Sequence, residues 1–143
     1  MNEALHQIRK KYIDLITGNI SISGAVVPIY NVVPSTQNTP FIRIYSYIQE
    51  EVDVNNTNFN TECITRIEPI TSFIGDSGGE YHLNLIIDGI LSLIRTRTNI
   101  DLSAEGFNVY TTTIDKIRYF EDFKNDETFY RAIIEVSNKV EKI

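Results

Sequence analysis

The chain has 143 residues and a formal net charge of −6, and 42% of its residues are hydrophobic. This length and composition predict one folded domain over residues 1–143 and exclude global disorder. The acidic balance argues against a phosphate-binding protein. A single cysteine, Cys63, excludes an intrachain disulfide, and neither a membrane span nor a signal peptide is recognisable, so we expect an intracellular protein.

The first predicted element is an amphipathic helix over residues 3–16, which ends at Gly18. Its apolar residues recur at three- and four-residue spacing (Leu5, Ile8, Tyr12, Leu15 and Ile16). Two short apolar segments follow, Ile20–Ile22 and Val26–Val33. Because the second contains a proline, which cannot donate a ladder hydrogen bond, we expect short strands or an arm at the edge of a sheet.

The clearest strand signal is Phe41–Val54, where apolar and polar residues alternate. Ile42, Ile44 and Ile48 are expected to face the core. The opposite face would carry Phe41, Arg43, Tyr45 and Tyr47. Aromatic residues and arginine are enriched in protein contacts, so this face is a candidate interface; a second packed layer is the alternative.

A polar segment, Asn55–Asn60, is predicted to be a loop tip between this strand and a return strand, Cys63–Ile74. Asn55, Asn56 and Phe59 are candidate contacts within it. The preceding acidic run (Glu50, Glu51 and Asp53) lacks the spaced pattern of a calcium loop, and a solvated strand end explains it more simply.

The stretch GDSGGEYHL, Gly75–Leu83, contains the letters that surround the nucleophilic serine of chymotrypsin-like proteases. Such a serine needs a histidine base, and neither His6 nor His82 lies in a suitable motif; that family also has two barrels and a proline where this chain has Glu80. Ser77 and Glu80 instead predict a helix-capping box. A helical apolar stripe follows it directly (Leu83, Ile86, Ile87, Ile90, Leu91 and Ile94).

Two further strands, Phe107–Phe120 and Thr128–Val140, are predicted after this helix, joined by the turn FKNDET. The order is therefore helix, short strands, two long strands, helix and two long strands. This order predicts an α+β fold with a mostly antiparallel sheet and two helices packed on one face.

No set of residues predicts chemistry. The sequence has neither a phosphate-cradling glycine loop nor a histidine pair at metal spacing. We therefore expect a protein that is not an enzyme, with no catalytic residues, no cofactor and no metal.

The order of elements resembles that of the tail-terminator, or tail-completion, proteins of tailed bacteriophages. The similar features are a first helix, an arm with VVP at Val32–Pro34, a proline-led strand in TPFIRIYSY, a hairpin that returns through CITRIEPITSFI, a helix from about Glu80 to Thr96 and a final hairpin. The asparagine-rich segment Asn55–Asn60 and the terminal VEKI depart from that pattern and leave open a neck or connector role.

The resemblance implies a structural protein of the virion, assembled in the host cytoplasm as a homo-oligomeric ring of about six copies. Such a ring caps the tail tube, joins it to the neck proteins and leaves a channel through which DNA passes without specific binding. An acidic protein suits that channel, because like charge keeps phosphates unbound. Glu50, Glu51 and Asp53 are then candidate channel-lining residues.

Two alternatives come from other classes of protein. One is an intracellular adaptor, or binding module, that uses a sheet edge to bind a partner. The other is a small enzyme. The mass of the assembled protein separates the ring from both.

Overall fold

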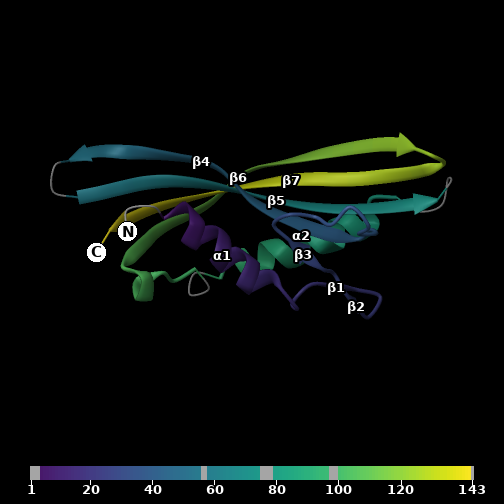
Figure 1. Ribbon diagram of the computed structural model, residues 1–143, viewed down its shortest axis with the longest axis horizontal. Coiled ribbons are helices and arrows are strands. Elements are labelled where there is room, and N and C mark those ends of the chain that lie inside the picture. Colours follow the sequence, from purple (N-terminus) through teal and green to yellow (C-terminus); the bar gives the residue numbers. More distant parts are fainter. Residues whose placement is uncertain (1–3, 56–57, 75–78, 97–99, 143) are drawn as a thin grey trace.

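The computed structural model describes residues 4–55, 58–74, 79–96 and 100–142. Figure 1 shows a long, twisted sheet with both helices on one of its faces. The elements in chain order are α1 (Leu5–Ile16), β1 (Ser21–Ile22), β2 (Ala25–Val26), β3 (Ile29–Tyr30), β4 (Phe41–Asn55), β5 (Asn58–Ile74), α2 (Tyr81–Ile94), the 3-10 turn η2 (Ser103–Glu105), β6 (Phe107–Lys124) and β7 (Glu127–Lys142).

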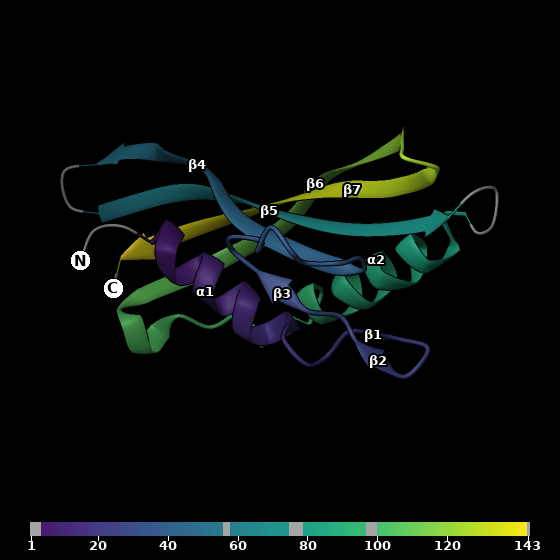
Figure 2. The same cartoon turned by 45° about the vertical axis from the view of Figure 1, so that its right-hand side comes forward.

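Within the described residues, five strands form the sheet in the order β3-β4-β5-β7-β6. Only β3 and β4 run parallel; the other neighbouring pairs are antiparallel. The predicted α+β class, with a mostly antiparallel sheet and two helices on one face, is confirmed. The two long hairpins extend toward opposite ends of the sheet (Figure 2).

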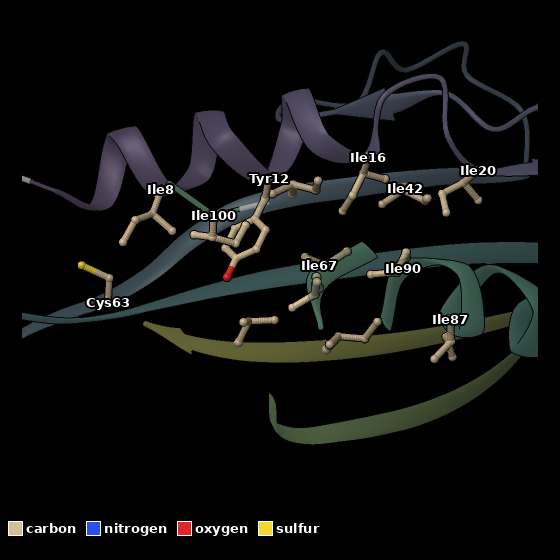
Figure 3. Packing of buried hydrophobic residues seen from close by; sticks show 14 of the residues in the cluster. Ile8, Tyr12, Ile16, Ile20, Ile42, Cys63, Ile67, Ile87, Ile90 and Ile100 are labelled. Atoms are coloured by element: carbon tan, nitrogen blue, oxygen red, sulfur yellow. The ribbon is translucent and has the colours of Figure 1, made fainter. Parts of the chain in front are cut away.

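The core lies between the helices and the sheet (Figure 3). α1 buries Ile8, Tyr12 and Ile16, which share one face because they lie four residues apart. α2 buries five residues of its predicted stripe (Leu83, Ile86, Ile87, Ile90 and Ile94). The sheet meets them with fully buried isoleucines such as Ile42 and Ile67, and burying one such side chain stabilises the fold by about 1.5–3 kcal/mol.

The β1–β3 arm packs against α2 through the buried residue Ile20. A Cβ atom placed on Gly89 of α2 would lie 2.8 Å from the Ile20 Cδ1 atom. Glycine therefore permits the close approach of the arm to the middle of this helix.

The beginning of α2 differs from the predicted capping box. The first helical residue is Tyr81, and Glu80 occupies the N-cap position without a side-chain capping bond. Glu80 is therefore not the third residue of the helix, which the capping box requires. Ser77, the predicted cap, lies outside the described residues.

The prediction that Ile48 faces the core with Ile42 and Ile44 is wrong. The register between β4 and β5 shifts between Ser46 and Ile48, so Tyr47 is an extra residue in β4. Such a β-bulge reverses the alternation of faces beyond it. Ile42 and Ile44 are buried under the helices, whereas Ile48 pairs with Ile64 on the opposite face.

The predicted loop Asn55–Asn60 is also shorter in the structure. Asn55 ends β4, Asn58 begins β5, and the two residues pair with each other. The strands therefore continue almost to the tip of the hairpin, which forms a long arm of the sheet.

The β6–β7 hairpin likewise has a tighter turn than FKNDET suggests. Lys124 pairs with Glu127, and the two residues between them, Asn125 and Asp126, have positive φ angles of 53° and 61°. These angles match a two-residue type I′ turn, for which asparagine and aspartate are favoured.

Candidate interaction surface

The sheet face opposite α1 and α2, which we call the outer face, is not covered by any described helix or strand (Figure 1). The strand register places its side chains in rows that cross the sheet. One row runs from Tyr45 on β4 through Arg66 on β5 and Glu135 on β7 to Lys116 on β6. Because directly opposite side chains in a sheet contact each other, these rows define the chemistry of the face.

The carboxylate of Glu135 binds its neighbours on both sides of this row, Arg66 and Lys116. Arg66 donates to its Oε1 atom from Nη2 at 2.8 Å and from Nε at 3.1 Å, and Lys116 Nζ lies 3.8 Å from Oε2. The Arg66 guanidinium also lies 3.4 Å from the centre of the Tyr47 ring. The ion pair and the aromatic ring together fix the orientation of this arginine.

A second network is centred on Glu68. Its carboxylate lies 3.4 Å from Arg131 Nη1 and accepts a hydrogen bond of 3.2 Å from the Tyr45 hydroxyl. Arg43 lies over the Tyr45 ring at 4.3 Å, and Arg131 lies over the Phe120 ring at 4.6 Å. Burial and the nearby Glu68 carboxylate raise the pKa of the Tyr45 phenol, which keeps the hydroxyl protonated as a donor.

The carboxylates of Glu68 and Glu135 are nearly shielded from solvent, although no described helix or strand lies over them. Glu68 is 4% exposed and Glu135 is 6% exposed. The neighbouring arginine and tyrosine side chains cover them and supply their hydrogen-bond partners. The charges at the centre of the outer face are therefore already paired within one subunit.

Half-buried apolar residues fill the spaces between the two networks. They are the outward-facing members of their strands and include aliphatic and aromatic side chains (Phe41, Ile48, Ile64, Ile70, Phe129 and Ile133). The solvated face of an antiparallel sheet is usually polar. This mixture of isoleucine, phenylalanine, tyrosine and arginine instead has the composition of a protein interface.

The structure places Phe41, Arg43, Tyr45 and Tyr47, the predicted candidate interface residues of β4, together on this face. Sequence reasoning missed the charged residues of the two networks, namely Arg66, Glu68, Arg131 and Glu135. Their sequence signal is weak, because each is a single charged residue with an apolar neighbour in β5 or β7. Which charge meets which depends on the register between strands, and that register cannot be read from the sequence.

The candidate channel-lining residues lie toward the free end of the β4–β5 hairpin. Glu50 is exposed and lies directly opposite Glu62, while the backbones of Glu51 and Asp53 lie opposite Thr61 and Asn60. A glutamate directly opposite another glutamate is unfavourable, so this end of the outer face is a site of like-charge repulsion.

The remaining predicted contacts lie near the same hairpin tip. The backbones of Asn55 and Phe59 belong to β4 and β5. Asn56 lies outside the described residues, as do the side chains of Glu51, Asp53, Asn55 and Phe59.

The other end of the outer face is hollowed into an open groove of about 1040 Å³. Its floor includes Phe41, Glu68, Ile70 and Arg131, and the segment 37–39 forms one rim. The groove combines apolar and charged walls, which suits a protein side chain or loop better than a purely polar ligand.

Within the part of the chain that the structure describes, no cluster of histidine, cysteine, aspartate and glutamate is arranged to hold a metal ion. No helix there is both long and apolar enough to cross a bilayer. His82, near the start of α2, is half-buried with its ring 5.3 Å from that of Phe73.

The sequence matches no protein-family model and no curated protein. The class of the protein rests on its structure alone. It is an α+β protein whose open sheet face carries paired charges and aromatic residues.

Proposed function

We propose that this chain is a structural subunit of a homo-oligomeric ring at the tail end or head–tail neck of a tailed bacteriophage. The ring would cap the tail tube, join it to the neck and leave a channel for DNA. The observation that carries the proposal is the outer face, a broad surface of interface composition that no described helix or strand covers. The resemblance of the element order to tail-terminator proteins supports the phage setting.

The pairing of charges makes the outer face suitable for burial in a contact. Burying an unpaired charge costs several kcal/mol, whereas Glu68 and Glu135 already have arginine partners. A neighbour can therefore cover this face through its apolar and aromatic side chains without leaving these carboxylates unpaired.

A closed ring also limits the kind of contact that neighbouring subunits can make. Each subunit must offer two different surfaces, because a self-complementary contact closes after two copies. Six copies would carry a formal charge of about −36, six times the −6 of one chain. Part of that charge would face the channel, where it keeps the DNA backbone from binding.

Size-exclusion chromatography with light scattering, followed by electron microscopy, tests the ring. We expect a mass several times 16.4 kDa, either for the protein alone or after tail-tube and neck proteins are added. Tyr47→Asp should prevent the ring from forming. Tyr110→Asp is the matched control. The two tyrosines are similarly exposed, Tyr47 to 47% and Tyr110 to 45%. Tyr110, however, lies on a different surface, beside Ile94 of α2.

A monomer that persists with tube and neck proteins present would rule out the ring. In that case the adaptor becomes the better candidate, because β6 forms a free edge of the sheet to which a partner strand can add. An adaptor would give a one-to-one complex with its partner, which the same measurement detects.

A further inference from the structure

The strand β6 forms a long edge of the sheet, separate from the centre of the outer face. β7 pairs with one side of it, and no described strand pairs with the other side. Its two register shifts lie in the first half, between Val109 and Thr111 and between Ile114 and Lys116. Proteins use such bulges to prevent edge pairing, so the regular second half is the part left open to another strand.

The sequence of this open half, IRYFEDF over residues 117–123, is complementary to itself in an antiparallel pair. When Phe120 lies opposite Phe120 of a second copy, each arginine faces an aspartate and each isoleucine faces a phenylalanine. The opposed pairs are Ile117–Phe123, Arg118–Asp122, Tyr119–Glu121 and Phe120–Phe120. Opposite-charge and apolar cross-strand pairs of this kind stabilise a sheet.

Other registers lose this complementarity. A shift of one residue places Ile117 opposite Asp122 and Lys116 opposite Phe123. The favoured register does bring Lys116 opposite Lys124, but Lys116 lies 3.8 Å from the Glu135 carboxylate in its own subunit. The repulsion between these two lysines is therefore partly neutralised.

The same stretch exposes apolar side chains that a second strand would cover. Tyr119 and Phe123 are among the most exposed large hydrophobic residues. Phe120 and Arg118 lie on the outer face, where the Phe120 ring already contacts Arg131.

We propose that two copies of this chain pair through residues 117–123 of β6, antiparallel and about a two-fold axis at Phe120. The axis is perpendicular to the sheet, so the two five-stranded sheets become one ten-stranded sheet. Both outer faces then lie on the same side of it, and all four helices lie on the other. This pairing does not depend on the ring.

Cross-linking tests the position of the axis. A residue on a two-fold axis lies opposite itself, at a Cα distance of about 4.5–5.5 Å, which is within the range of a disulfide. Phe120→Cys should therefore form covalent dimers under mild oxidation. Asn84→Cys, on an exposed position of α2, is the control for random collisions, and the wild-type chain controls for the buried Cys63.

Charge reversal tests the register, with the cross-linking rate of Phe120→Cys as the readout. Arg118→Asp or Asp122→Arg alone places like charges opposite each other at two positions per dimer and should slow cross-linking about tenfold. The double variant Arg118→Asp/Asp122→Arg restores both pairs and should restore the rate. Circular dichroism confirms that each variant is folded.

Three results would overturn the pairing: no covalent dimer with Phe120→Cys, equal dimer formation with Asn84→Cys, or single reversals without effect. The outcome is separable from that of the ring. Tyr47→Asp should leave the Phe120→Cys dimer intact, because Tyr47 lies on β4, three strands away from the β6 edge.

Discussion

The Tyr12 hydroxyl on α1 donates a hydrogen bond of 2.6 Å to the Asn138 Oδ1 atom on β7, across 126 positions of the chain. Asn138 Nδ2 in turn donates to Thr112 Oγ1 on β6 at 2.9 Å. Tyr12 and Asn138 are fully buried. One hydrogen-bonded network, buried at Tyr12 and Asn138, therefore connects the first helix, the last strand and the edge strand.

Tyr12→Phe should lower the free energy of unfolding by about 1–3 kcal/mol, because it leaves the buried Asn138 oxygen without a donor. Urea denaturation followed by circular dichroism measures this change. Tyr110→Phe is the control, since the Tyr110 side chain is exposed and its loss of a hydroxyl should have little effect. Equal stability of Tyr12→Phe and wild type would show that the bond makes no net contribution.

The same tyrosine predicts a loss of stability at alkaline pH. Burial raises the pKa of the Tyr12 phenol above its usual value of 10.0. The unfolded chain therefore ionises near pH 10 while the folded chain does not, so the contribution of Tyr12 is complete below pH 10 and declines above it.

Wild-type stability should accordingly fall more steeply between about pH 10 and 11.5 than that of Tyr12→Phe, which has no phenol to ionise. Denaturation of both proteins across this range measures the two slopes. Parallel slopes would mean that Tyr12 ionises equally in the folded and unfolded chains.

Removing one partner of the Arg66–Glu135 ion pair should lower the free energy of unfolding more than removing both partners. Arg66→Met should lower the free energy of unfolding by about 1–3 kcal/mol, because it leaves the Glu135 carboxylate short of partners. The double variant Arg66→Met/Glu135→Leu should recover most of that loss. Thermal and urea denaturation of the single and double variants make the comparison; a double variant less stable than Arg66→Met would contradict this account.

Asp115 is expected to destabilise the protein at neutral pH. Burial and the carboxylates of Glu62 and Glu135 raise the pKa of its side chain above 3.8. A raised pKa in the folded state favours the protonated form, so stability is lost as the pH rises through that pKa. Because solvent screens charges at this exposed position, Asp115→Asn should increase the free energy of unfolding at pH 7 by less than about 1 kcal/mol, and by a smaller amount at pH 3. Asp14→Asn, at an exposed site on α1, is the control.

The channel prediction concerns Glu50, Glu51 and Asp53 within the proposed ring. Replacing all three with lysine should change the free energy of unfolding by no more than about 0.5 kcal/mol. It should slow DNA ejection from phage particles in a salt-dependent way, because lysines bind phosphates. The control is a triple variant with the same change of charge at exposed sites elsewhere, Asp14→Lys/Asp88→Lys/Glu105→Lys. Equal ejection rates for the two triple variants would place the acidic run outside the channel.

Local patterns in the sequence determined the type and order of the elements. The four-residue spacing of Ile8, Tyr12 and Ile16 is enough to predict a helix and the face that it buries, because both depend on residues that are neighbours on one turn. Alternation likewise predicted β4 and placed Phe41, Arg43, Tyr45 and Tyr47 on one face.

The alignment of neighbouring strands and the contacts between distant residues were decided only by the tertiary structure. The bulge at Tyr47 moved Ile48 away from the core, because a bulge depends on how two strands align and not on either strand alone. The pairs Arg66–Glu135 and Tyr12–Asn138 join residues 69 and 126 positions apart. Such contacts exist only after β5, β7 and α1 have packed together, since no local propensity specifies which distant side chains become neighbours.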